Sequence, residues 1–136
     1  LKPFIDTRFR TLPDRQHTFI SGSSMGGLMT LYALLMHNDV FSRGAALSPT
    51  LDIDIDQLCQ MIQEAELTPD TVLYMDYGRR EFDYEHWSRN NFVRAAQLLG
   101  SKDILLSTRL VPEGEHNEAS WEKQLPFAIP TLMYNI

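Results

Sequence analysis

FISGSSMGG, residues 19–27, is the stretch that decides the fold. The run from His17 to Ser21 is mainly apolar and predicts a short buried strand that ends at Gly22. From Met25 to His37 apolar residues lie on most sides of a helical projection, as expected for a helix buried against a sheet. The stretch therefore predicts a strand, a tight turn and a helix in direct succession.

The turn itself satisfies the motif G-x-S-x-G through Gly22, Ser24 and Gly26, in the strand-to-helix context that this motif requires. Such a turn, a nucleophile elbow, holds its serine in a strained backbone geometry, so we expect side chains at the two glycine positions to collide with the neighbouring turn. The N–H of Met25 would then point at a developing oxyanion, at the positive end of the helix. The alternative is a glycine-rich turn that only packs a helix onto a strand.

The rest of the chain alternates between helix and strand patterns. Further strands are expected at residues 44–47, 71–76 and 104–111, and further helices at 1–9, 54–66 and 87–99 and in the tail from 117. Gly100 is placed to cap the helix before it, and Pro126 and Pro130 are expected to interrupt the tail. This α/β order predicts a mainly parallel sheet with helices on both faces, and ligands beyond the carboxyl ends of its strands.

A serine nucleophile needs a base, and the chain has four histidines. His17 precedes its strand, at the wrong end of the sheet, and His37 lies at a helix end, where it suits the helix dipole. His86 is not excluded by its position. His116 follows the last strand directly and completes the order serine, acid, histidine that α/β-hydrolases use.

The acid is expected in the loop after the strand at 71–76. The candidates are Asp76, Glu81, Asp83 and Glu85. Asp76 falls within the strand, where its side chain would organise the loop instead. Glu81 has the reach and the position, although an ion pair with Arg79 or Arg80 would also explain it.

Two acidic clusters raise the question of a metal. Asp52, Asp54 and Asp56 are explained by N-capping at the start of a helix, and the spacing of an EF-hand is absent. A second cluster, residues 83–86, lacks HExxH or CxxC spacing. We therefore expect no metal and no cofactor.

Composition excludes some classes of binding partner. A net charge of −6 without a basic patch argues against nucleic acid, and no apolar run approaches the ~20 residues of a membrane span. Cys59 is the single cysteine, so the redox compartment is undecided. Localisation stays open, with the cytoplasm favoured.

With these residues in place, the sequence resembles the esterase D-like family of α/β-hydrolases, which includes S-formylglutathione hydrolases, feruloyl esterases and enterochelin-type esterases. The resemblance covers essentially the whole chain and is carried by residues 19–27, by 74–78 together with Glu81, and by GEHNEASW at 114–121. It implies a Ser24–His116–Glu81 triad, although many relatives have aspartate at the position of Glu81.

The resemblance also implies that residues 1–136 form a single domain, the C-terminal part of an α/β-hydrolase fold that lacks its N-terminal strands. The strand at 17–21 would then have an unpaired side, completed by a missing segment or another chain, with a homo-oligomer possible. The second oxyanion donor would lie in the missing part.

The sequence thus predicts a serine esterase that hydrolyses a small-molecule carboxylic ester through an acyl-enzyme. An acyltransferase would use the same triad with an alcohol in place of water. A non-catalytic binding module on the same fold is the third reading.

Overall fold

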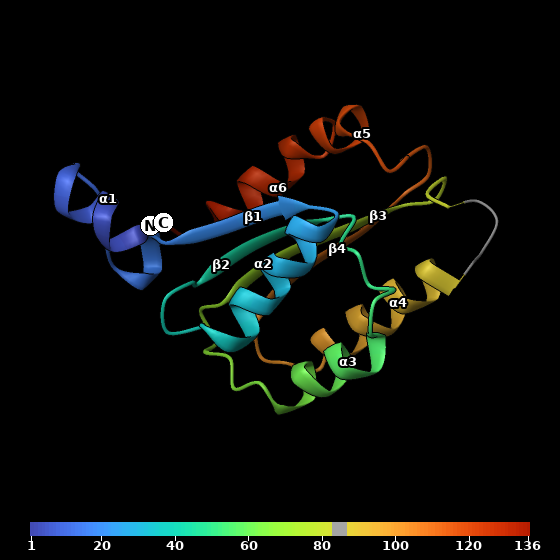
Figure 1. The fold of residues 1–136 in the computed structure, drawn as a ribbon, viewed down its shortest axis with the longest axis horizontal. Helices are drawn as coiled ribbons and strands as arrows, with labels where there is room; N and C mark the ends of the chain where they lie inside the picture. The colour runs from blue at the N-terminus through green and yellow to red at the C-terminus, as the bar shows by residue number, and fades with distance from the viewer. Residues whose placement is uncertain (83–86) are drawn as a thin grey trace.

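The chain folds around one parallel sheet, and the computed structural model describes residues 1–82 and 87–136. The strands are β1 (Phe19–Ser23), β2 (Arg43–Leu47), β3 (Val72–Gly78) and β4 (Leu105–Val111), in the order β1-β2-β3-β4. The helices are α1 (Lys2–Arg8), α2 (Met25–Met36), α3 (Ile55–Glu64), α4 (Trp87–Leu99), α5 (Glu118–Glu122) and α6 (Leu125–Leu132). All strand pairs are parallel, so the strands end at one common edge of the sheet (Figure 1).

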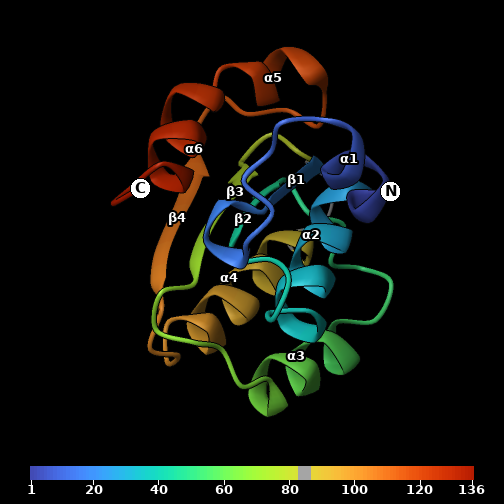
Figure 2. The ribbon, with the colours of Figure 1, turned by 90° about the vertical axis from the view of Figure 1, so that its left-hand side faces the viewer.

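The helices form two layers, as expected for such a sheet. Because successive strands are neighbours and crossovers share one hand, the connecting helices α2, α3 and α4 fall on one face. α5 and α6 follow β4 and lie on the opposite face (Figure 2). The predicted α/β sheet with helices on both faces is confirmed.

Each face has its own hydrophobic core. The core under α2, α3 and α4 is built mainly from Leu31, Leu34, Leu58, Ile62, Leu73, Met75, Phe92 and Leu99. The smaller core under α6 contains Ala45, Leu47, Tyr74, Ala128 and Leu132. β2 and β3 are buried along their whole length, which makes them a rigid base for the loops at their carboxyl ends.

The tail is fixed to the sheet by two arginines. The buried guanidinium of Arg43 donates to the carbonyl oxygens of Leu132 (2.9 Å) and Tyr134 (2.6 Å), at the end of α6 where acceptors lack helical partners. The guanidinium of Arg109 lies 3.5 Å from the ring centroid of Phe127. These contacts hold α6 against β2 and β4.

The tail is interrupted, but not at the two prolines where the interruption was predicted. The chain breaks between α5 and α6, before Pro126, which occupies the first turn of α6, where an N–H needs no helical acceptor. Pro130 lies inside α6 without ending it, because the helix continues to Leu132. Packing on the sheet outweighs the hydrogen bond that proline removes.

Other boundaries shift by a few residues. β1 begins at Phe19 rather than His17, since residues 15–17 form a 3₁₀ turn that Asp14 caps, and it runs on to Ser23. β3 continues two residues past Asp76, to Gly78. Gly100 does follow α4 and bonds the carbonyl of Ala96 (2.8 Å), but without the positive φ of a left-handed cap.

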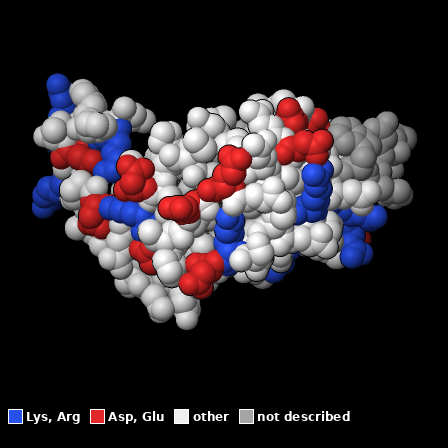
Figure 3. Space-filling model, turned by 90° about the horizontal axis from the view of Figure 1, so that it is seen from below, with Lys and Arg blue, Asp and Glu red and all other residues white. Residues whose placement is uncertain are grey.

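The surface carries both signs of charge. On the face that bears α3 and α4, acidic and basic side chains are interspersed over the described residues (Figure 3). One pair there joins the two helices, with Asp56 accepting from Arg94 at 2.6 Å. Among the described residues, no helix has the length and hydropathy needed to span a bilayer.

Candidate active site

The turn between β1 and α2 holds Ser24 in an unusual backbone conformation, with φ 55° and ψ −121°. A positive φ is strained for a residue with a side chain, and three hydrogen bonds maintain it. The N–H of Ser24 donates to the carbonyl of Leu47 (3.0 Å), and its carbonyl accepts from Leu28 and Thr50 (both 3.1 Å). Met25 begins α2, so its N–H has no acceptor one turn earlier in the helix.

The glycines of the motif have unequal roles. A Cβ on Gly22 would lie 2.6 Å from the backbone of Gly26, so Gly22 permits this close turn. A Cβ on Gly26 would meet no atom of the described residues within 4 Å, so the expected collision is wrong for that position. Gly26 faces outward from the first turn of α2. Gly27 instead packs on the loop after β2, where a Cβ on it would lie 2.9 Å from the Cα of Pro49.

Three predicted residues meet beyond the carboxyl ends of β1, β3 and β4. The Nε2 of His116 lies 2.8 Å from the Oγ of Ser24, and its Nδ1 lies 2.7 Å from Oε2 of Glu81. The ring is held between two aromatic side chains, with centroid distances of 5.0 Å to Phe82 and 5.1 Å to Trp121. A carboxylate, an imidazole and a hydroxyl thus form one hydrogen-bonded line.

Glu81 is a buried residue, not a surface ion-pair partner. Its side chain is fully shielded from solvent, and Oε1 accepts from the N–H of Gly78 (2.6 Å) and the hydroxyl of Ser48 (2.5 Å). Arg80 pairs with Glu113 instead. The carboxylate is therefore held by donors on one oxygen while the other faces His116.

Ser48 and Asp76 support this carboxylate, and the sequence did not indicate the role of Ser48. Ser48 has a φ of 43°, and its N–H donates to Oδ1 of Asp76 (3.0 Å) while its hydroxyl reaches Glu81. Oδ2 of Asp76 accepts from the Tyr74 hydroxyl (2.9 Å). Burial raises the pKa of Asp76 to about 6. As predicted, Asp76 lies within its strand, but the loop that it holds is the one after β2, through Ser48, and not the loop after its own strand.

The loops that carry Glu81 and His116 contact each other through their backbones. A Cβ on Gly78 would overlap the backbone of Gly114, and one on Gly114 would lie 2.7 Å from the Cα of Gly78. The N–H of Arg80 donates to the carbonyl of Gly114 at 2.9 Å. This contact fixes the distance between the acid and the base.

The other histidines lie elsewhere. The Nδ1 of His17 pairs with Asp14 at 2.8 Å, before β1, and His37 caps the C-terminus of α2. His86, with the acid candidates Asp83 and Glu85, lies outside the described residues.

The N-capping expected for the first acidic cluster is found for Asp54 alone, because Asp52 and Asp56 bind side chains of α4. Asp54 caps α3 by accepting from the N–H of Gln57 (2.9 Å), and Asp52 accepts from Ser88 (2.7 Å). Within residues 1–82 and 87–136, no three histidine, cysteine or acidic side chains gather as metal ligands.

A family profile described as putative esterase matches residues 1–132. The chain belongs to the putative esterase family. The family predicted from the sequence is thereby confirmed, and solved structures of esterases share the fold. No curated protein sequence is detectably similar to the chain.

Three of those structures show how far the likeness extends. An IroE-like serine hydrolase from Shewanella oneidensis is 21% identical, with a TM-score of 0.77 over 93% of this chain. S-formylglutathione hydrolase from Staphylococcus aureus is 19% identical (TM-score 0.70, 96% covered), and the enterobactin esterase of Shigella flexneri is 20% identical (TM-score 0.80, 96% covered). The chain spans only 42%, 56% and 34% of those proteins, respectively.

Proposed function

We propose that this esterase-family protein hydrolyses carboxylic esters, with Ser24 as nucleophile, His116 as general base and Glu81 as the acid of the triad. The observation that carries the proposal is the hydrogen-bonded line from Glu81 through His116 to the Oγ of Ser24, at 2.7 and 2.8 Å. Each of the three groups comes from a separate loop at the same edge of the sheet.

The hydrogen bonds from Glu81 through His116 to Ser24 can run in the direction that acyl transfer needs. With the imidazole proton on Nδ1, facing the buried Glu81, Nε2 accepts the proton of Ser24 as Oγ attacks the ester carbonyl. The Glu81 carboxylate then stabilises the imidazolium. The donors from Gly78 and Ser48 keep that carboxylate aligned with His116.

The negative charge of the tetrahedral intermediate falls near the start of α2. The N–H of Met25 is the donor that this chain offers there, supported by the helix dipole. His116 next returns its proton to the leaving alcohol, and an acyl group stays on Ser24. Water, activated by His116, releases the acid and restores the serine.

The nucleophile is tested with a fluorophosphonate probe on the full-length protein. We expect covalent labelling of one residue, Ser24, and no labelling or ester turnover in Ser24→Ala. Ser23→Ala is the matched control, because it removes the neighbouring hydroxyl and leaves the line intact. Absence of labelling in a folded wild-type protein would favour a binding module instead.

The acid is tested separately. Glu81→Gln should lower kcat by up to about 10⁴-fold, because a neutral amide holds the wrong tautomer and does not stabilise the imidazolium. Asp76→Asn keeps the size of its side chain and does not touch His116, so its effect should be much smaller. Strong loss in Asp76→Asn with little loss in Glu81→Gln would overturn the assignment.

A further inference from the structure

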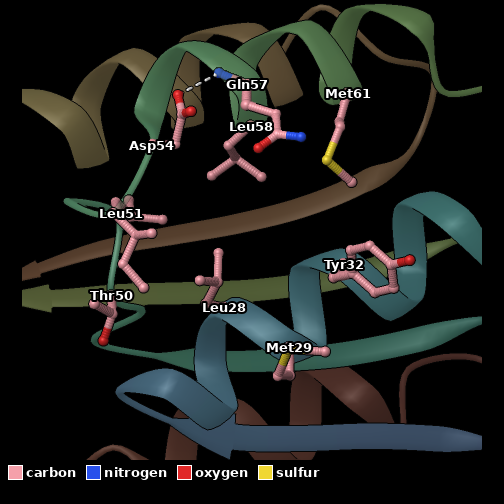
Figure 4. A pocket seen from close by; sticks show the side chains of 10 residues that line it. Leu28, Met29, Tyr32, Thr50, Leu51, Asp54, Gln57, Leu58 and Met61 are labelled. Carbon is pink, nitrogen blue, oxygen red and sulfur yellow. Dashed lines mark hydrogen bonds between the residues drawn. The ribbon is translucent and has the colours of Figure 1, made fainter.

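A pocket of about 190 Å³ lies between α2 and α3, bounded by the loop after β2 (Figure 4). The side chains that define it here are Leu28, Met29, Tyr32, Thr50, Leu58 and Met61. The triad of the proposed function does not use it.

The pocket begins one side chain away from the nucleophile. The Oγ1 of Thr50 lies 3.3 Å from the Oγ of Ser24 and lines the pocket. Leu28 stands one helical turn after Ser24 and donates its N–H to the serine carbonyl. The near end of the pocket therefore lies beside the Ser24 oxygen, separated from it by the Thr50 side chain.

The lining selects for an uncharged, apolar group. Most of it is aliphatic or thioether side chain, and its one carboxylate, Asp54, is already engaged in capping α3. An apolar cavity of about 150 Å³ is enough to bind benzene, so this volume admits a ring or a chain of about six carbons. A formyl or acetyl group would leave most of it empty.

The position relative to His116 distinguishes the two halves of an ester. The imidazole rests edge-on against Trp121 of α5, which packs on the core under α6. The pocket lies on the opposite face of the sheet, between α2 and α3. Because His116 must donate to the departing alcohol, the alcohol belongs on the α5 side and the acyl group on the pocket side.

We propose that this pocket binds the acyl group of the substrate, and that the preferred esters carry an apolar acyl group of about six carbons or a single ring. This inference rests on the proposed function, because it needs an acyl group on Ser24.

The test uses Met29→Trp in the full-length protein, with p-nitrophenyl acetate and p-nitrophenyl hexanoate as substrates. Met29 lines the pocket and is 50% exposed within these 136 residues, so a larger side chain there fills the space without disturbing the core that these residues form. The matched control is Met36→Trp, two turns further along α2, with 52% exposure and no contact with the pocket.

We expect wild type to prefer hexanoate, and Met29→Trp to lower kcat/KM for hexanoate by about tenfold or more while acetate changes less than about twofold. Met36→Trp should resemble wild type. If Met29→Trp changes kcat/KM for neither acetate nor hexanoate, the assignment of this pocket to the acyl group is wrong, while the proposed esterase activity stands. If the wild-type protein shows neither ester turnover nor fluorophosphonate labelling, the proposed function itself is wrong.

Discussion

At the scale of single residues, Asp76 links the stability of the site to pH. Its carboxyl is buried, and burial raises its pKa from the ordinary 3.8 to about 6, against the opposing effect of the bonds from Tyr74 and Ser48. Between those two values the folded protein binds more protons at Asp76 than the unfolded chain does. Its contribution to stability is therefore highest below about pH 4, falls as the pH rises from 4 through 6, and then levels off, with a total loss of about 3 kcal/mol at most.

Asp76→Asn isolates this effect, because asparagine keeps the shape and does not titrate. We expect the free energy of unfolding of wild type, relative to the variant, to decrease between about pH 4 and about pH 7.5 in urea titrations. Carboxyls that do not interact with Asp76 titrate equally in both proteins and cancel in the difference. A difference that does not change with pH would mean that folding does not raise the pKa of Asp76.

Residue by residue, the sequence indicated the members of the proposed triad better than the residues that hold them in place. Ser24 followed from a motif in its structural context, and His116 from its loop and the family resemblance. The fixing of Glu81 by Ser48 was not predictable, since it depends on a serine with positive φ, which no local signal marks. The general rule that ligands gather after the strands would have directed attention to residues 48–50.

At the scale of elements, the contact between the β3 and β4 loops determines whether the acid reaches the base. Gly114→Ala would push the Gly78 backbone away, because the new methyl group would sit 2.7 Å from its Cα. We expect a loss of about 1–3 kcal/mol in stability and a drop of about ten- to hundredfold in the rate of fluorophosphonate labelling.

Gly100→Ala is the control for that change. Gly100 has no positive φ, and its new methyl would come no closer than 3.3 Å, to the carbonyl of Ala96. Stability should change by less than about 1 kcal/mol, and the labelling rate should not change. Equal labelling rates in the two variants would show that the loop contact does not position Glu81.

Helices such as α3 were predictable from the helical spacing of their apolar residues, and the fully buried strands β2 and β3 from short continuous apolar runs. The order of one helix and then four strand–helix units was predicted, and so were the bounds of α4. The end of an element is harder to predict: β1 begins at Phe19 because one hydrogen bond to Asp14 caps a 3₁₀ turn over residues 15–17. The prediction at Pro130 was wrong because packing of α6 on the sheet offsets the free-energy cost of a proline inside a helix. A local sequence pattern contains no information about that packing.

At the scale of the whole molecule, apolar surface gathers beside the nucleophile strand. Among the described residues, β1 pairs with β2 alone, so its other edge presents unpaired backbone groups. Next to it, the residues at helical spacing on α2 are 41–52% exposed: Met25, Met29, Tyr32 and Met36. An open strand edge next to such a stripe favours pairing with a further strand, and the prediction that another segment or chain completes the sheet remains a proposal.

If the free edge of β1 pairs with other chains, the 136 residues expressed alone should self-associate at roughly 100 μM. A charged side chain on β1 should suppress this self-association. Ser21 is exposed in the middle of β1, so Ser21→Lys places a lysine there at little cost to the fold. Gln60→Lys adds the same charge on exposed α3 and is the control. In sedimentation velocity we expect oligomers for wild type and Gln60→Lys and mainly monomer for Ser21→Lys. A monomeric wild type would mean that the edge of β1 does not drive self-association. Equal association in both variants would mean that the chains associate through a surface other than β1.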